Sequence, residues 1–572
     1  MAPSAIMPSP DALSLAEQVA QMVVVRTSGH LFDHEIRYPA WEADRATLHH
    51  YIADLGVGGV ILLGGSAAEV GLKTQELQTL AQVPLLIAAD IEEGVGQRFS
   101  GATWFPPPMA LADIAKRDLP QAEAYAEAMG AVTAEEALAI GLNWVLAPVA
   151  DVNNNPENPV INVRAFGDTP EIVAALTTAF VRGAQRQGAL TTAKHFPGHG
   201  DTAVDSHLEL PVLPHDGERL QRVELPPFQS LIDAGVDTVM TAHLTIPALD
   251  RQYPATLSDR MLTGLLREQM GFDGLIVTDA LIMGAITRTY GPYEAAVLAV
   301  EAGADILLMP KDPEGCIKAV VEAVTTGRIA PERIADSVER LWRAKQRVAS
   351  RLSVPPESCH AWEHVPPPPI YLDPFLRPES QHLVTDILTA STTVVGQVPP
   401  CDPQHPGDNL ILVDSVVDCP FLNRTAPTIS LPAQANYQLQ LVDHQGCQRW
   451  PQDNILRPTL MQIFLRGNPF RGSAAVSPLV QAWLEALLAT NHLRGIVVYG
   501  SPYALDYLQT QYLGAPSRTV TASAEAPNLS HRNLPYGFSY GQMAAAQHHL
   551  LTALGLGTIT TERPTQTVAF TD

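Results

Sequence analysis

Eight short apolar runs recur along roughly the first 345 residues, each followed by a polar or Gly-containing turn and a stretch with helical spacing. The runs are rich in Val, Ile and Leu and do not alternate with polar residues, which is typical of strands buried on both faces of a parallel sheet. Eight strand–helix units in about this length predict a (β/α)8 barrel of the TIM type. The runs are Gln21–Arg26, Val57–Leu63, Pro84–Ala89, Leu142–Ala147, Ala189–Ala193, Thr238–Ala242, Gly274–Thr278 and Ala304–Met309.

The remainder of the 572-residue chain is too long to join the same core, so a second domain is expected. A Pro-rich stretch follows the eighth unit and predicts an extended, semi-rigid linker. Beyond it, apolar runs such as Asn409–Val413 and Gly495–Tyr499 alternate with helical stretches such as Leu479–Thr490, which indicates a smaller α/β layered domain. The predicted parts are a barrel domain in residues 1–350, a linker in 351–371 and the α/β domain in 372–572.

Composition excludes several classes of protein. The formal net charge of −24 repels phosphate backbones and anionic lipid, so nucleic acid is not expected as a partner. The five Cys form no C-x-x-C pair, which argues against a structural zinc site or a disulfide framework. No apolar run is long enough to span a bilayer, and the first residues lack the pattern of a signal peptide. We therefore expect a cytoplasmic protein; the sequence leaves the oligomeric state open.

Polar side chains follow many of the predicted strands directly. A single polar residue at this position is often only a helix cap or a turn former. In a barrel, however, the carboxyl ends of all strands converge on one face, where active sites lie. Several such residues together therefore favour a shared site. They are Asp90, Asp151, Lys194, His195, His243 and Asp279.

Two segments offer groups suited to catalysis. Asp279 follows the seventh run, where a rigid and partly desolvated carboxylate could act as a nucleophile or simply cap the next helix. In Asp205-Ser206-His207, the Asp could orient the imidazole of His207 and raise its proton affinity, which would make a general acid and base. The alternative for His207 is a solvated loop residue.

The same loop has the composition of a metal site, since it contains His195, His199, Asp201, Asp205 and His207. Its spacing lacks the helical H-x-x-x-H pattern, so we expect no metal. The cations Arg98, Arg164 and Lys194 could hold oxygen atoms of a substrate or be surface charges. No P-loop or strand-linked G-x-G-x-x-G motif is present, and a nucleotide cofactor is therefore disfavoured.

Three segments carry a family resemblance: KHFPGHGDTAVDSHLELP, GFDGLIVTDALIMGAI and APVADVNNNPENPVINVRAFGD. Together with DIEEGVGQRF, VMTAHL, PATLS and AVEAGADILLMP, they occur in order over most of residues 15–345. This combination resembles glycoside hydrolase family 3, and within it the β-N-acetylglucosaminidase branch. The segments GNPFRG and VVYGSPYAL resemble the second domain of two-domain members.

The resemblance implies a retaining exo-β-N-acetylglucosaminidase that acts through a covalent glycosyl-enzyme intermediate, without metal or cofactor, on a carbohydrate such as a cell-wall fragment. Asp279 would be the nucleophile, His207 the acid and base, and Asp205 the residue that orients His207. The positions that match sugar-binding residues of the family are Asp90, Arg98, Arg164, Lys194 and His195.

The chain departs from the family pattern D-x-E-G-G-R-V after the third strand, where Glu93, Val95 and Gly96 stand at the first Gly, the Arg and the Val. Arg98 stays in register. Alternative functions are a β-glucosidase or β-xylosidase of the same family, a phosphorylase that transfers the sugar to phosphate, and a sugar-binding protein without catalysis. The Asp-x-His loop argues against the first, and a His acid/base is compatible with the second because it does not repel phosphate.

Overall fold

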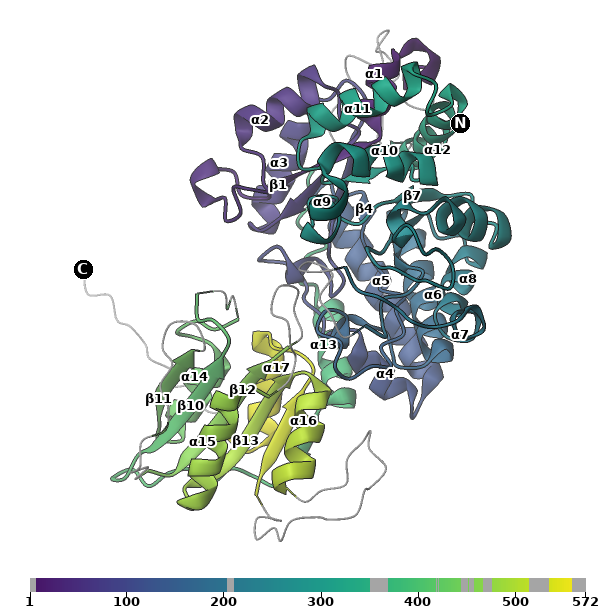
Figure 1. The fold of residues 1–572 in the computed structure, drawn as a ribbon. Coiled ribbons are helices and arrows are strands. Elements are labelled where there is room, and N and C mark those ends of the chain that lie inside the picture. The colour runs from purple at the N-terminus through teal and green to yellow at the C-terminus, as the bar shows by residue number, and fades with distance from the viewer. Residues whose placement is uncertain are drawn as a thin grey trace, which may run out of the picture. The chain divides into compact units, whose positions relative to one another are not determined.

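The computed structural model describes residues 7–202, 210–349, 369–417, 419, 421–443, 451, 457–466, 476–513 and 534–557 (Figure 1). These residues divide into two compact units, the first up to Ala390 and the second from Ser391 onward. Residues 351–368 of the predicted linker 351–371 lie outside the described residues, so the extent of the linker stays a prediction. Residues 372–390, predicted to belong to the second domain, group with the first unit.

The first unit is a ring of eight parallel strands, which confirms the predicted barrel. Neighbouring strands pair in chain order, β8 pairs with β1, and a bridge between Val277 and Ile306 joins β7 to the end of the ring. Each observed strand overlaps one of the eight predicted runs. The strands are β1 (Val23–Ser28), β2 (Gly59–Leu63), β3 (Leu86–Ala89), β4 (Trp144–Val145), β5 (Leu190–Phe196), β6 (Thr238–Thr241), β7 (Leu275–Val277) and β8 (Leu307–Leu308).

Strand β5 is the longest in the barrel and carries polar groups into its core. All seven of its residues are buried, and it continues through Lys194 and His195 to Phe196. Lower in the barrel, Trp144 Nε1 donates to Thr192 Oγ1 at 2.9 Å and to Thr238 Oγ1 at 3.1 Å, so neighbouring strands satisfy one another's buried polar atoms. These contacts fix the strand on which Lys194 and His195 are mounted.

Helices surround this ring and begin at residues suited to capping. Ser14 and Ser66 form capping boxes with Glu17 and Glu69 at the starts of α1 and α3. Helices α5 and α6 approach closely at Gly183, where a Cβ atom would lie 1.9 Å from the carbonyl oxygen of Glu127. The helices are α1 (Leu15–Gln21), α2 (Arg45–His49), α3 (Ala67–Leu80), α4 (Met109–Ala115), α5 (Leu119–Ala139), α6 (Pro170–Gln187), α7 (Gly217–Arg222), α8 (Leu225–Asp233), α9 (Gly284–Tyr290), α10 (Pro292–Ala302), α11 (Pro313–Thr325), α12 (Pro331–Ala349) and α13 (Pro378–Ser391).

Shorter helical segments occur in the connections. Those used below are η2 (Asp33–Glu35), which follows β1, and η5 (Asn162–Arg164), which lies between β4 and α6. The others are η1 (Pro10–Ala12), η3 (His50–Asp54), η4 (Val95–Gln97), η6 (Ala255–Leu257), η7 (Arg260–Gln269) and η8 (Gln509–Leu513).

The second unit is the predicted α/β layered domain, built on a six-stranded sheet of order β11-β10-β12-β13-β14-β9. All pairs are parallel except β14 with β9. Its core includes Ile411, Leu460, Val497 and Leu550, which are at most 1% exposed. The elements are β9 (Thr393–Val395), β10 (Gly407–Val413), α14 (Pro427–Gln434), β11 (Tyr437–Asp443), β12 (Thr459–Leu465), α15 (Pro478–Ala489), β13 (Leu493–Gly500), α16 (Pro502–Leu508), β14 (Tyr536–Ser539) and α17 (Ala544–Ala553).

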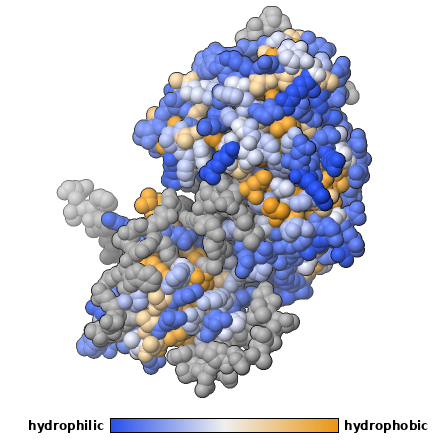
Figure 2. All heavy atoms as spheres, in the orientation of Figure 1, coloured by the Kyte–Doolittle hydropathy of each residue, from blue (hydrophilic) through white to orange (hydrophobic). Residues whose placement is uncertain are grey.

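The surface is predominantly polar on the face shown in Figure 2, where apolar residues form separate patches among polar ones. Within the described ranges, every helix is too short or too polar to cross a membrane.

Candidate active site

A cluster of four charged side chains, those of Asp90, Glu92, Arg164 and Lys194, lies at the carboxyl ends of β3 and β5. Lys194, on β5, is 1% exposed and places its Nζ 2.8 Å from Asp90 Oδ1 and 2.6 Å from Glu92 Oε1. Arg164, at the end of η5, donates from Nε and Nη2 to the two oxygens of Glu92, at 2.9 and 2.8 Å. The bidentate pair fixes the plane of the Glu92 carboxylate, and Glu92 in turn holds Lys194.

The charges in this cluster stabilise one another. Burial raises the pKa of the Glu92 carboxyl, but the charges of Arg164 and Lys194 outweigh it and hold this pKa well below its ordinary value. Burial lowers the pKa of Lys194, and the carboxylates of Asp90 and Glu92 reverse that effect and raise it. The four groups are therefore ionised together at neutral pH.

Asp90 is the accessible member of this charge cluster. Its side chain is 36% exposed, whereas that of Glu92 is 3% exposed. Burial raises the pKa of the Asp90 carboxyl, but Lys194 and Arg98 outweigh this effect and leave the pKa below its ordinary value. Arg98 is exposed and donates from Nε to the carbonyl oxygen of Asp90 at 2.9 Å. An ionised carboxylate held from behind and open on one side can accept hydrogen bonds from sugar hydroxyls.

The residues that depart from the family pattern are packed within the turn after β3. Glu93 is fully buried and accepts a hydrogen bond from Trp104 Nε1 at 2.9 Å. At Gly96 a Cβ atom would lie 2.4 Å from the carbonyl oxygen of Ala102, so the chain passes where no side chain fits. Next to this turn, Asp90 contacts Lys194.

His195 is held by Asp151, which follows β4. The ring Nδ1 of His195 lies 2.8 Å from Asp151 Oδ2, and its backbone N–H donates to Asp151 Oδ1 at 3.2 Å. Burial raises the pKa of the fully buried Asp151 carboxyl, but His195 outweighs this effect and lowers it. An ionised Asp151 keeps a proton on Nδ1, so the ring has a fixed orientation.

Asp279 follows β7 and is partly exposed. Its Oδ1 accepts a hydrogen bond at 2.7 Å from the backbone N–H of Ala280. His243, which follows β6 and is fully buried, donates from Nε2 to the carbonyl oxygen of Ala280 at 3.1 Å. The predicted nucleophile is therefore mounted on a turn that a neighbouring strand holds in place.

Of the eight residues predicted for the site, Lys194 contacts Asp90 directly and reaches Arg164 through Glu92. Arg98 contacts the backbone of Asp90. His195 lies next to Lys194 on β5, and Asp279 is at the same end of the barrel. Asp205 and His207 lie outside the described residues. Sequence reasoning missed Glu92 as a site residue and noted Asp151 only as a strand-end residue, although Glu92 belongs to the quoted D-x-E pattern.

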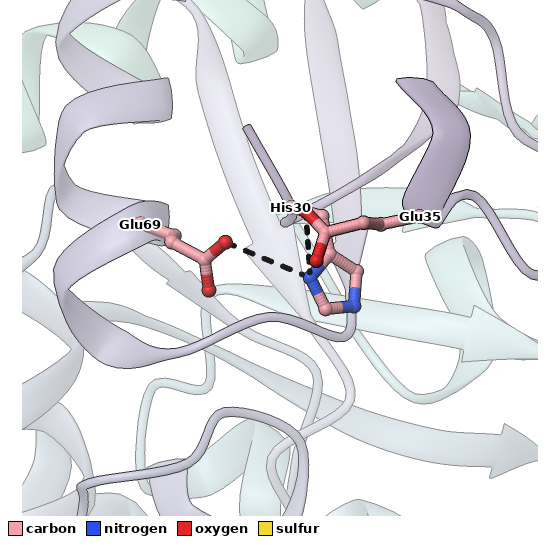
Figure 3. Close-up of side chains that lie close together, drawn as sticks. All are labelled: His30, Glu35 and Glu69. Atoms are coloured by element: carbon pink, nitrogen blue, oxygen red, sulfur yellow. Dashed lines mark ion pairs between the residues drawn. The ribbon is translucent and has the colours of Figure 1, made fainter. Parts of the chain in front are cut away.

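Three possible metal ligands come together elsewhere, at the rim formed by the loop after β1 and the start of α3 (Figure 3). His30 Nδ1 lies 3.9 Å from Glu35 Oε2, at the end of η2, and 3.7 Å from Glu69 Oε1. Glu69 also accepts from Ser66 in the capping box of α3. When His30 is protonated, these contacts are ion pairs that tie the loop to the helix.

The fold and the site together define a barrel enzyme, with carboxylates, imidazoles and buried cations at the carboxyl ends of its strands. The family model described as the N-terminal domain of glycosyl hydrolase family 3 matches residues 14–344. The bacterial C-terminal domain of the same family matches residues 401–515. The chain belongs to glycosyl hydrolase family 3.

Individual relatives agree with this assignment. A β-hexosaminidase A from Pseudoalteromonas piscicida is 35% identical over 332 residues, which cover 53% of this chain and 55% of that protein. A β-N-acetylglucosaminidase/β-glucosidase from Cellulomonas fimi is 32% identical over 315 residues, again 53% and 55%. The chain thus spans about half the length of these relatives. The solved family 3 β-N-acetylglucosaminidase from Paenibacillus sp. FPU-7 is 31% identical, with a TM-score of 0.72 over 95% of this chain and 96% of that one.

Proposed function

We propose that this chain is a retaining exo-β-N-acetylglucosaminidase that releases terminal N-acetylglucosamine from cell-wall fragments or related glycosides. The observation that carries the proposal is the buried Lys194, which links Asp90 and Glu92 at the end of the barrel where Asp279 lies. The similarity to the Paenibacillus β-N-acetylglucosaminidase along nearly the whole chain supports the same substrate class.

In the first step, a carboxylate oxygen of Asp279 attacks the anomeric carbon and forms an ester, while the glycosidic bond breaks. The leaving oxygen takes a proton from His207, which Asp205 orients. In the second step, a water molecule gives a proton to His207, which is now neutral, and the oxygen of this water attacks the same carbon. The ester breaks, Asp279 regains its carboxylate, and two inversions retain the configuration.

The remaining residues bind the sugar. Asp90, ionised and open on one side, accepts hydrogen bonds from hydroxyl groups. Lys194 and His195 present donors from β5, and Arg164 acts through Glu92, which it holds in place. Arg98 steadies the backbone of Asp90 and adds positive charge at the rim. We propose no metal or cofactor in this chemistry and a cytoplasmic location.

The test is an initial-rate comparison of aryl β-N-acetylglucosaminide with aryl β-glucoside bearing the same aglycone, with and without phosphate. The proposal expects a preference for the N-acetyl sugar in plain buffer and a β-configured first product in proton NMR. A preference for glucoside would assign the chain to the β-glucosidase activity, and faster release in phosphate would make it a phosphorylase. Sugar binding without release from either substrate would leave a binding protein.

A further inference from the structure

The loop after β1 and the start of α3 bring one imidazole and two carboxylates together (Figure 3). His30 Nδ1 lies 3.7 Å from Glu69 Oε1 and 3.9 Å from Glu35 Oε2, so both carboxylates are directed at the same nitrogen. One ligand atom from each of the three residues lies within 4.8 Å of the other two. The proposed mechanism uses none of these residues.

The separations between these atoms are too long for hydrogen bonds. A nitrogen and an oxygen joined by a hydrogen bond lie about 2.7–3.2 Å apart. His30 Nδ1 is a buried atom and, among the described residues, has no hydrogen-bond partner. The ligand atoms of a tetrahedral zinc ion, each about 2.0–2.1 Å from the metal, lie about 3.3 Å from one another. Small side-chain rotations bring Nδ1 and the two carboxylate oxygens to that spacing.

The backbone around His30 is fixed by close packing. The N–H of Gly29 donates to the carbonyl oxygen of Leu63 at 2.9 Å, and the N–H of His30 donates to Ser28 Oγ at 3.2 Å. At Gly29 a Cβ atom would lie 2.1 Å from the carbonyl oxygen of Gly64, so the loop after β1 lies directly against the turn after β2. The imidazole is therefore mounted on the ends of two neighbouring strands.

The two carboxylates also lie on defined elements. Glu69 Oε2 accepts from the backbone N–H and the hydroxyl of Ser66, at 2.7 and 2.8 Å, and the backbone N–H of Leu31 donates to the same carboxylate. Glu35 is the last residue of η2. A carboxylate that is itself hydrogen-bonded is typical of a metal ligand, because the surrounding contacts orient it before the ion binds.

The charge balance of the three residues favours a divalent cation. Within the described ranges, neither Glu35 nor Glu69 forms an ion pair with a lysine or an arginine. With a neutral imidazole the group carries two negative charges, which one divalent ion neutralises. The side chains of Glu35 and Glu69 are 38% and 26% exposed, so an ion can enter from the surface. An imidazole nitrogen with carboxylate oxygens suits Zn²⁺ and related ions, whereas Ca²⁺ and Mg²⁺ take oxygen ligands.

We propose that His30, Glu35 and Glu69 form a binding site for one divalent transition-metal ion of the Zn²⁺ class, with a water molecule as the fourth ligand. The ion ties the loop after β1 to α3 and takes no part in the proposed hydrolysis. The inference is independent of the proposed function, since none of the three residues is assigned to the substrate or to catalysis.

The test is Zn²⁺ binding to the full chain after dialysis against EDTA and removal of the chelator. Isothermal titration calorimetry gives affinity and stoichiometry, and thermal unfolding with and without Zn²⁺ gives the shift in Tm. We expect His30→Gln and Glu35→Gln each to weaken binding by more than about tenfold, because even the loss of a residue that only orients a ligand costs about that much. Zn²⁺ should raise the Tm of the unmodified protein and leave that of both variants unchanged.

His50→Gln is the matched control. His50 also lies near two carboxylates, but Asp54 is 2.9 Å from its Nδ1 and Glu314 is 3.6 Å from its Nε2. The two acids face different nitrogens of the ring, so no single ion reaches all three groups. This variant should bind Zn²⁺ as the unmodified protein does.

Three results would overturn the proposal: no Zn²⁺ binding by the unmodified chain, unchanged binding in both His30→Gln and Glu35→Gln, or equal weakening in His50→Gln. Circular dichroism without metal shows whether each variant is folded. Glu35 is the most exposed of the three residues, so Glu35→Gln tests the site even if His30→Gln does not fold. A failure of the proposed function is seen separately, in the rates with aryl glycosides, and leaves the Zn²⁺ result unaffected.

Discussion

A lysine is buried at each end of the barrel, and the pKa values of the two are shifted in opposite directions. At the carboxyl ends of the strands, Lys194 contacts two carboxylates, and their charges raise its pKa. At the opposite end, Lys345 of α12 is fully buried, its Nζ donates to the neutral amide of Gln21 at 2.6 Å, and burial lowers its pKa to about 7. Burial alone lowers the pKa of a lysine, whereas a buried positive charge is maintained where carboxylates surround it.

The largest effect is expected from a substitution of Asp279, the proposed nucleophile at the carboxyl ends of the strands. Asp279→Ala should lower kcat for the aryl β-N-acetylglucosaminide by about 10⁴-fold or more, because no covalent intermediate can form. The fold should persist, since Asp279 is partly exposed at the end of its strand. Initial rates and circular dichroism check both statements, and a variant with near-normal rates would rule out the nucleophile assignment.

Removing the positive charge at the same end should affect both activity and stability. Lys194→Met leaves Glu92 with one cation fewer and Asp90 without its buried partner. We expect a loss of about 3 kcal/mol in the free energy of unfolding, typical of breaking a buried pair, and about a 100-fold loss of kcat/KM. Denaturant unfolding measures the first. The control is Lys116→Met, which removes an exposed pair with Asp168 and should cost at most about 1 kcal/mol. Equal losses in both variants would contradict the role of the cluster.

At the opposite end, the comparison predicts a pH dependence with a definite sign. Between about pH 7 and the ordinary pKa of lysine near 10.5, the unfolded chain binds a proton at Lys345 that the folded chain does not. The free energy of unfolding therefore rises with pH across this window, by up to about 1.4 kcal/mol per pH unit from this group. Below pH 7 both states bind the proton, and the contribution of Lys345 becomes constant and unfavourable.

Lys345→Met should remove this slope and stabilise the protein at pH 7. Denaturant unfolding at intervals from pH 7 to 10 tests it, with Lys318→Met as the control because Lys318 is exposed and pairs with Glu314. A slope that survives in Lys345→Met would show that other groups cause it.

The smallest effect is expected from the removal of metal ions. Treatment with EDTA should change kcat/KM by less than about twofold, because the proposed mechanism uses carboxylates and an imidazole without a Lewis acid. Metal-free buffer with and without added Zn²⁺ or Ca²⁺ provides the measurement. A large loss that one of these ions restores would direct attention to His30, Glu35 and Glu69.

The barrel could be predicted because its strands are apolar on both faces and each is followed by a helix. The same reasoning missed β11 and β14 in the second unit. In β11 the run Tyr437–Asp443 alternates with Gln, as suits the edge of a sheet, and β14 is a four-residue strand in which Gly537 packs against Leu550 of α17. Short or half-polar strands are recognised only from their neighbours.

The site was predictable in composition but not in its pairings. Lys194 and Asp90 are 104 positions apart, and only the ring of strands brings them together. Resemblance to a family supplied the sugar-binding residues, whereas Glu92 became visible only as the partner of both Lys194 and Arg164. Among the described residues, Nε2 of the buried His199 has no hydrogen-bond partner, and no spacing in the sequence indicates this result of packing.

The distribution of the charge cluster over separate βα units also bears on how this chain could be recombined with relatives. Glu92 follows β3, Arg164 belongs to the connection after β4, and Lys194 lies on β5. A crossover between residues 98 and 164 would place Glu92 and its two cations in segments of different parentage. A crossover after α8 would inherit the three together. Chimeras of the first kind should therefore fold only when the other parent supplies matching charges at these positions.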